Sequence, residues 1–288
     1  MERKAYAGFV LPSVVVMTVL MVVPFVTTVW LSLTDLNLRD LDSAPFIGFD
    51  NYTEIFSDDR FRSALKFTLI FVAFIVPAQL VMGLGVALLL DRVSRGRGIY
   101  IAIFLLPFVA TPVVGTLAFD NLFSRGGLLA YVIEKITGEQ FVISAGNVNY
   151  LILVQALWYT MPFVMITLFA GLQTLPQERL EAAQVDGARF WRTLWHVTLP
   201  HLRKLIIFIV IIAIMDAYRV FDSVYVFAGN RFTESHTLAV YNYSVALDSK
   251  IGRLGKGNAV AILMVLGIFI VLLPFLVKSY KEQVAERR

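Results

Sequence analysis

Three ionisable residues stand at intervals of three inside a stretch of the sequence that is otherwise apolar. Asp216, Arg219 and Asp222 follow the uncharged run of residues 205–215, and this spacing predicts that they share one face of a helix. Because an ionisable group at the centre of a membrane costs roughly 2.5–3.5 kcal/mol, we expect the arginine to bridge the two carboxylates. Two interpretations stay open. The charged face lines a water-filled path, or it is a structural ion-pair network.

The rest of the sequence offers little for catalysis or metal binding. There are no cysteines, and the three histidines are scattered along the chain. The sequence GKGN at residues 255–258 lacks the Gly-x4-Gly-Lys-Ser/Thr spacing of a phosphate-binding loop. No pair of nucleophile and base stands out. We therefore expect no catalytic residue, no metal site and no cofactor in this chain.

The composition is that of an integral membrane protein. Hydrophobic residues make up 58% of the chain and charged residues 16%, whereas soluble domains average about 25% charged. The net charge of +4 could suggest nucleic acid. The cations stand beside apolar segments, however, which is the pattern that orients membrane helices rather than a nucleic-acid face. The partner predicted from composition is the lipid bilayer.

Six apolar segments are expected to cross the membrane as helices, which makes the chain an all-α membrane protein with one transmembrane domain over residues 1–288. A helix needs about 20 residues to span the hydrocarbon core. Pro107 and Pro112 predict a break or bend within the third segment. The first segment is too long for the apolar region of a signal peptide and is expected to remain as a helix. The segments lie at about residues 9–34, 67–90, 99–119, 150–172, 202–227 and 258–277.

The distribution of cations predicts that both termini lie in the cytoplasm. With the N-terminus inside, the inner side holds fourteen of the 25 Lys and Arg residues, the outer side holds ten, and Arg219 lies within a segment. The inner cations are densest in the short turn of residues 92–98 and around residues 176–204, and Arg287 and Arg288 add to them at the C-terminus. Lys and Arg near the ends of spans favour the cytoplasmic side.

The loop of residues 176–200 is built unlike the segments on either side of it. Its apolar residues recur at spacings of three and four, which indicates two short amphipathic helices. Gly187 stands between them, where glycine can take the left-handed conformation that ends a helix. Pro176 and Pro200 flank the loop, and proline is suited to the first turn of a helix. The pattern predicts a helix-turn-helix at the membrane surface.

This loop resembles the EAA loop of permease subunits of bacterial ABC sugar importers. The resemblance rests on Glu-Ala-Ala at 181–183, Asp-Gly-Ala at 186–188 and Thr-Leu-Pro at 198–200, and FIGFDNYTEIF at 46–56 is a second family mark. It implies the compact six-span form of such a permease in the bacterial inner membrane. It also implies that the loop docks on a cytoplasmic ATPase, through Glu181, Ala182, Ala183, Asp186, Gly187 and Pro200.

The same resemblance implies the partners and the substrate path. A second homologous permease would complete the path, two ATPase subunits would hold ATP and Mg²⁺, and an extracytoplasmic solute-binding protein would deliver a sugar-like substrate. RVFDSVY at 219–225 is similar to the fifth-span motif of the maltose-type permease, and residues 158–163 are similar to its fourth span. The implied path residues are Tyr159, Phe163, Ile214, Tyr218, Arg219, Phe221 and Asp222.

Two questions stay open from the sequence. The Gly-Gly-Pro usual after the fifth span is replaced by AGNRF at 228–232, which predicts a different outer loop. The alternative function is a free-standing secondary transporter or channel that uses Asp216, Arg219 and Asp222 as an ion or proton relay. The sequence does not say whether the sugar is neutral or anionic.

Overall fold

The computed structural model describes residues 2–229, 231–247 and 252–286. Arg287, Arg288 and Asn230, which the sequence analysis placed in the basic tail and the outer loop, lie outside these residues. Regular structure in the described chain is helical, apart from two isolated β-bridges that join Thr34 to Phe46 and Asn37 to Asp40. The predicted all-α class is confirmed.

The contacts divide the chain into two compact units. The first comprises Met1–Arg62 with Leu238–Phe269, and the second comprises Ser63–Thr237 with Ile270–Arg288. Two long helices, α3 (Asp59–Arg92) and α13 (Leu254–Glu286), each contribute to both units.

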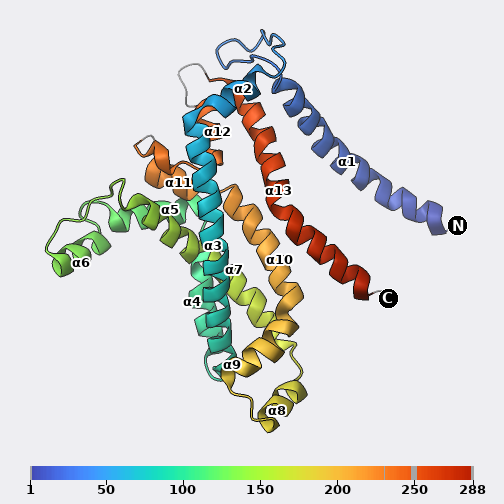
Figure 1. Ribbon diagram of the computed structural model, residues 1–288, viewed down its shortest axis with the longest axis vertical. Coiled ribbons are helices and arrows are strands. Elements are labelled where there is room, and N and C mark those ends of the chain that lie inside the picture. Colours follow the sequence, from blue (N-terminus) through green and yellow to red (C-terminus); the bar gives the residue numbers. More distant parts are fainter. Residues whose placement is uncertain (1, 230, 248–251, 287–288) are drawn as a thin grey trace. The chain divides into compact units, whose positions relative to one another are not determined.

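The first unit holds α1 (Glu2–Leu31), α2 (Asp50–Ser57), α12 (Leu238–Ala246) and the start of α13 (Figure 1). The apolar stretch Val10–Leu31 of α1 has no buried share within the chain, so its side chains suit a lipid environment. Asn51, which is buried, fixes the loop after α1 by donating to the carbonyls of Ser32 and Thr34, both at 2.9 Å.

A cluster of charges ties α2 to α12 and α13 within this unit. Lys256, with 6% of its side chain exposed, places its Nζ 3.0 Å from Glu54 Oε1 and 3.5 Å from Asp58 Oδ2. Arg253 also binds Glu54, at 2.5 Å, and the Tyr241 hydroxyl donates to Asp58 Oδ2 at 2.8 Å. A buried cation is tolerated when it is paired and hydrogen-bonded in this way.

The second unit is built around α3, α7 (Val148–Gln173) and α10 (Leu199–Tyr218) (Figure 1). Its core is formed by buried Leu, Val, Met, Ile, Phe and Ala residues of these three helices. Two glycines let the helices approach closely: a Cβ at Gly83 would lie 2.6 Å from Val164 Cγ1, and one at Gly171 would lie 2.6 Å from Leu205 Cδ2. Small residues at such contacts are typical of membrane helix packing. The unit also contains α4 (Arg97–Val109), α5 (Pro112–Phe123), α6 (Leu128–Thr137), α7 (Val148–Gln173), α8 (Gln177–Val185), α9 (Phe190–Thr193), η1 (Leu194–Thr198), α10 (Leu199–Tyr218), α11 (Asp222–Ala228) and η2 (Thr233–Ser235).

Five helical segments in the described residues are long and apolar enough to cross a membrane. A sixth is obtained if Arg97–Val109 and Pro112–Thr137, which are bent by 97° to each other, count as one span. The bend falls at Ala110 and Thr111, directly before Pro112, whose missing N–H suits the first turn of a helix. The break predicted in the third segment is therefore present, and it leaves Pro107 inside α4.

The fifth predicted segment is also broken, which the sequence analysis did not foresee. Helix α10 ends at Tyr218 and α11 begins at Asp222. The carbonyl of Val220, released by the break, accepts a hydrogen bond of 2.8 Å from the hydroxyl of Thr237, which is fully buried. The prediction that Asp216, Arg219 and Asp222 share one helix face is therefore wrong, because the argument from spacing assumed an unbroken helix.

Candidate functional site

The helix-turn-helix predicted at residues 176–200 is present in the second unit, at the end where α7 stops and α10 starts (Figure 1). Pro176 is the N-cap of α8, and Gly187 takes the predicted left-handed conformation with a φ of +70°. The turn is closed by backbone hydrogen bonds from Gly187 N to Gln184 O (2.9 Å) and from Ala188 N to Ala183 O (2.8 Å). We call residues 176–200 the surface loop.

The second half of the surface loop is continuous with the helix that follows it. Helix α9 passes through the π-helical turn Leu194–Thr198 into α10, and Pro200 stands in the first turn of α10. Proline has no N–H to donate, and the wider hydrogen-bonding pattern of a π turn accommodates that loss without ending the helix. The chain from Phe190 to Tyr218 is therefore helical without a break, and it changes direction between α9 and α10 (Figure 1).

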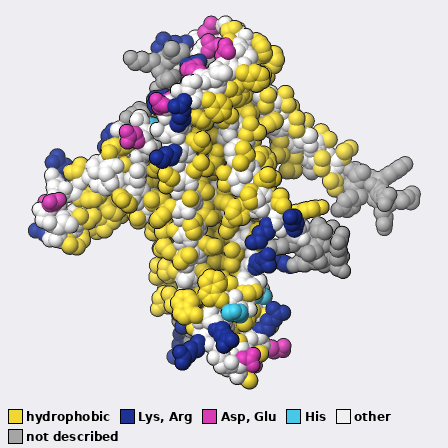
Figure 2. All heavy atoms as spheres, in the orientation of Figure 1, with side chains coloured by type: hydrophobic (Ala, Val, Ile, Leu, Met, Phe, Trp, Pro, Cys, Tyr) yellow, Lys and Arg dark blue, Asp and Glu magenta, His cyan; other side chains and the backbone are white. Residues whose placement is uncertain are grey.

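The surface loop presents both charged and apolar side chains. Glu181, Ala182, Asp186 and Pro200 are exposed, and Ala183 is half-buried. Large apolar side chains are exposed beside them: Val185 at 88%, Trp191 at 67% and Trp195 at 64%. Lys and Arg side chains surround this end of the unit (Figure 2). An exposed apolar patch rimmed by charges is typical of a surface that meets a partner or the lipid headgroups.

Two contacts join the helices at and next to the surface loop. Gln173 at the end of α7 donates to Asp91 Oδ1 on α3 at 2.6 Å. The Arg92 guanidinium lies 5.0 Å from the centre of the Phe190 ring, a distance at which a cation is attracted to an aromatic face. The end of α3 thus contacts both the end of α7 and the start of α9.

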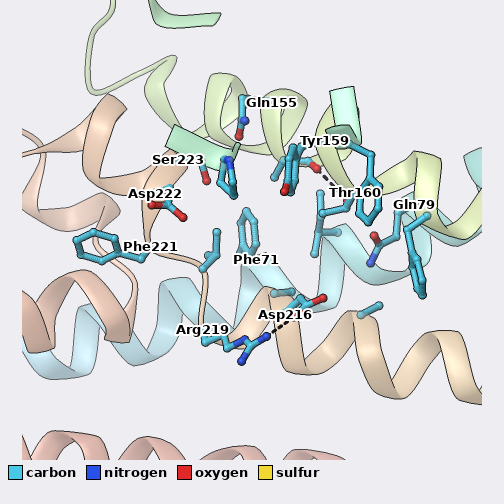
Figure 3. Close-up of a pocket in the computed structure, with 18 of the residues that line it drawn as sticks. Phe71, Gln79, Gln155, Tyr159, Thr160, Asp216, Arg219, Phe221, Asp222 and Ser223 are labelled. Carbon is cyan, nitrogen blue, oxygen red and sulfur yellow. Dashed lines mark hydrogen bonds and ion pairs between the residues drawn. The ribbon is translucent and has the colours of Figure 1, made fainter. Parts of the chain in front are cut away.

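A cavity of about 460 Å³ lies in the second unit, among α3, α4, α5, α7, α10 and α11 (Figure 3). Five of the predicted path residues line it. Two do not: Ile214 and Tyr218 are buried, with 3% and 2% exposed, and are not among the lining residues. Both positions were implied by the resemblance to the maltose-type permease, and their contact with a substrate stays a prediction. The lining path residues are Tyr159, Phe163, Arg219, Phe221 and Asp222.

The charges of the cavity are arranged differently from the prediction. Arg219 Nη2 lies 2.8 Å from Asp216 Oδ1. Asp222 makes no ion pair with Arg219, so the expected bridge between two carboxylates is wrong. Figure 3 shows Asp222 on the opposite side of the cavity from the Asp216–Arg219 pair. The break at residues 219–221 separates them.

Uncharged polar side chains in the cavity wall were missed by the sequence analysis. Gln79 and Gln155 are 3% and 2% exposed and line the cavity, as does Thr116, whose hydroxyl receives a hydrogen bond of 3.1 Å from Gln155 Nε2. The available signal was a glutamine inside an apolar helix, because polar residues in spans tend to face the bundle interior. Phe108 adds an aromatic wall and stacks against Phe163, with ring centres 6.1 Å apart.

The residues that the structure describes hold no group of three or more His, Cys, Asp or Glu side chains that could bind a metal ion. The residues that line the cavity offer hydrogen-bonding groups, aromatic faces and the charges of Asp216, Arg219 and Asp222. These are features of a binding or conducting site, in which polar groups orient a ligand against apolar walls.

Comparison with known proteins identifies relatives over nearly the whole chain. The family model of the binding-protein-dependent transport system inner membrane component matches residues 59–283. The trehalose/maltose transport system permease protein MalF of Thermococcus litoralis is 31% identical over 287 residues, covering 97% of this chain and 94% of that protein. The trehalose transport system permease protein SugA of Mycobacterium tuberculosis is 31% identical over 268 residues, covering 91% and 84%.

A solved structure shares the fold. One chain in the crystal structure of a bacterial ABC transporter involved in the import of the acidic polysaccharide alginate superposes with a TM-score of 0.84. The match covers 97% of this chain and 96% of that chain at 20% sequence identity. This likeness supports the helical architecture alone.

Proposed function

The chain belongs to the family of binding-protein-dependent transport system inner membrane components, and on this premise we propose that it forms one half of the path of an ATP-driven saccharide importer. A second, homologous permease forms the other half. Two ATPase subunits bind the coupling loops of the two permeases, of which the surface loop is one, and an extracytoplasmic binding protein delivers the substrate. Both termini and the surface loop face the cytoplasm.

The observation that carries this proposal is the physical link between the surface loop and the cavity. The continuous helical segment from Phe190 to Tyr218 starts in the loop, and Asp216 near its far end lines the cavity. The 20 residues of α10 alone, at 1.5 Å per residue, span about 30 Å between the loop and the cavity. Helix α7 makes the return connection, because Tyr159 and Phe163 line the cavity and Gln173 ends the helix beside the loop. A displacement of the loop would therefore be passed to two walls of the cavity through α10 and α7.

The exposed residues of the surface loop suit a protein partner. Glu181 and Asp186 supply charge, and Ala182 and Ala183 are small enough for a close approach to the partner's surface. Gly187 gives the turn that places α8 against the π-helical turn η1, and Pro200 stands where this turn joins α10. We assign these residues to ATPase coupling, with Glu181 paired to a basic residue of the ATPase.

The saccharide assignment rests on the cavity wall and on the family. The rings of Tyr159, Phe163 and Phe108 offer apolar faces for a sugar ring, and Gln79 and Gln155 offer donors and acceptors for hydroxyl groups. Relatives at 31–32% identity are named for the transport of trehalose and maltose, of diacetylchitobiose and of sulfoquinovosyl glycerol. A saccharide fits both features.

Cross-linking tests the coupling assignment directly. The chain has no native cysteine, so a single cysteine at Val185, which is 88% exposed, can carry a thiol-specific photo-cross-linker. Ala145→Cys, in an exposed loop between α6 and α7, is the matched control. The tagged chain is expressed in its native host and irradiated in the membrane. We expect Val185→Cys to capture a protein with ATPase activity and Ala145→Cys to capture none. An ATPase captured equally by both, or by neither, would contradict the assignment.

A further inference from the structure

We propose that the cavity selects its ligand by charge, and that Asp222 sets this preference. This half of the path admits neutral saccharides and repels anionic ones. The inference rests on the function proposed above and deepens it, because it names the charge class of the substrate at the same site.

The charges that line the cavity do not cancel. Its ionisable carboxylates and cations are Asp216, Arg219 and Asp222. Arg219 lies 2.8 Å from Asp216, so these two form a neutral pair. Asp222 has no ion-pair partner within the part of the chain that the structure describes, and it is half-buried at the start of α11. The cavity wall therefore carries one net negative charge.

The geometry keeps the positive charge of Arg219 from compensating Asp222. Figure 3 shows the Asp216–Arg219 pair on one side of the cavity and Asp222 with Ser223 on the other. An anionic ligand that approached Arg219 would meet Asp216 at the same place. One that approached Ser223 would meet Asp222. Asp222 is half-buried in a wall that is largely apolar, so water screens its charge less than it would at an open surface.

Two buried polar side chains point independently to a neutral, hydroxyl-bearing ligand. Gln79 and Ser223 line the cavity with 3% and 4% of their surface exposed. Neither side chain has a hydrogen-bond partner among the described residues. Their polar atoms open into the cavity rather than into packed protein, so they can bind a ligand or the water that it displaces. An amide and a hydroxyl, each able to donate and to accept, match the hydroxyl groups of a sugar.

The charge preference can be measured without knowing the sugar. Ser223→Cys places the sole cysteine of the chain in the cavity, in a near-isosteric exchange. The intact transporter, isolated with its partner subunits, is treated with two methanethiosulfonates of similar size, one carrying a trimethylammonium group and one a sulfonate. The labelling of this chain is followed by mass. The ratio of the two rates is divided by the ratio at Ala145→Cys, which lies in an exposed stretch with no charged residue within four positions. Any effect of Asp222 on the ionisation of the thiol cancels in this ratio.

We expect the cationic reagent to be favoured at Ser223→Cys by on the order of tenfold relative to the control, as for a cleft lined by charge of one sign. Adding Asp222→Asn should remove most of this preference, and Asp222→Glu, which keeps the charge, should retain it. A normalised ratio near one, or a ratio unchanged by Asp222→Asn, would overturn the inference and leave the proposed function standing. If neither reagent reaches Ser223→Cys while both react at Ala145→Cys, the cavity is closed to water, and the proposed path fails together with the inference.

Discussion

Arg219 donates a hydrogen bond of 2.8 Å to Asp216 across the last turn of α10, and the helix ends directly before the arginine. The two side chains remain 68% and 52% exposed. An ion pair this accessible contributes about 0–1 kcal/mol to stability. The main effect of the pair is therefore on the charge of the cavity, because Asp216 neutralises the only arginine that lines the described cavity.

Asp216→Asn should change the charge of the cavity and leave the stability of the chain nearly unchanged. The variant frees Arg219, so the net charge of the wall rises by one and the preference for the cationic reagent at Ser223→Cys should fall several-fold. Asp59→Asn is a matched control, because Asp59 and Arg62 form another exposed pair three residues apart, at 2.9 Å, away from the cavity lining. A fall in melting temperature much larger for Asp216→Asn than for Asp59→Asn would indicate a structural pair instead.

Gly187→Val should uncouple ATP hydrolysis from transport while the chain still inserts into the membrane. Nothing lies within 4 Å of a Cβ at this position, so the effect comes from the backbone alone. Its φ of +70° costs a residue with a side chain about 1–2 kcal/mol. We expect valine to leave this conformation and so to reorient α8 relative to α9. The measurement is substrate-stimulated ATPase activity of the assembled transporter.

Gly187→Asn separates backbone strain from the loss of a small residue. Asparagine visits the left-handed region more readily than other residues with a side chain, so this variant should keep most of the coupling that valine abolishes. Equal coupling in Gly187→Val and in the native chain would contradict the role assigned to the turn.

Features that depend on near neighbours in the chain could be predicted from the sequence. The turn at Gly187 and the break before Pro112 follow from backbone preferences of single residues, and both are found. The break at residues 219–221 could not be predicted, because Thr237, which binds the released carbonyl of Val220, lies 17 positions away. The expected bridge from Arg219 to both Asp216 and Asp222 is wrong for the same reason, because the break separates Asp222 from the arginine.

Gly83→Ala should destabilise the chain, and Gly85→Ala on the same helix should not. A Cβ at Gly83 would lie 2.6 Å from Val164 Cγ1 and 3.1 Å from the Met165 backbone nitrogen, whereas one at Gly85 would meet nothing within 4 Å. Overpacking of this kind costs typically 1–3 kcal/mol, and Gly85→Ala should be neutral or slightly stabilising. Thermal unfolding in detergent compares the two. Val164→Ala added to Gly83→Ala should restore part of the loss, and its failure to do so would show that the α3–α7 contact is not the cause.

Lys256→Met should loosen the attachment of α2 to α13 in the first unit. Removing the buried ammonium leaves Glu54 and Asp58 without their shared cation. The cost lies between that of exposed and that of buried pairs, on the order of 2 kcal/mol, because Glu54 remains 47% exposed. Arg39→Met is the control, since Arg39 is an exposed cation of the same unit. Proteolysis of the loop between α1 and α2 would report the loosening, and equal cleavage of both variants would argue against a role for the buried lysine.

The same cluster predicts how stability depends on acid. The hydrogen bond from Arg253 lowers the pKa of Glu54 from its usual 4.5, against the opposing effect of burial. Burial alone would raise the pKa of Asp58, but hydrogen bonds from Tyr241 and from the backbone of Arg60 bring it below the usual 3.8. A carboxyl with a lowered pKa in the folded state stabilises the fold fully above its unfolded pKa, and loses that contribution as the pH falls through the lowered value.

The unfolding temperature should therefore show no loss from this cluster between pH 7 and 5, and a decline as the pH falls below about 4.5. Other carboxylates titrate in the same range, so the informative quantity is the difference between the native chain and the double variant Glu54→Gln, Asp58→Asn. The double variant should be less stable at pH 7, and the gap should narrow on acidification, because protonation removes from the native chain what the substitutions have already removed. A difference in unfolding temperature that stays constant from pH 7 to pH 3 would mean that the two carboxylates titrate alike in the folded and unfolded chain. The charges of the cluster would then not stabilise the fold.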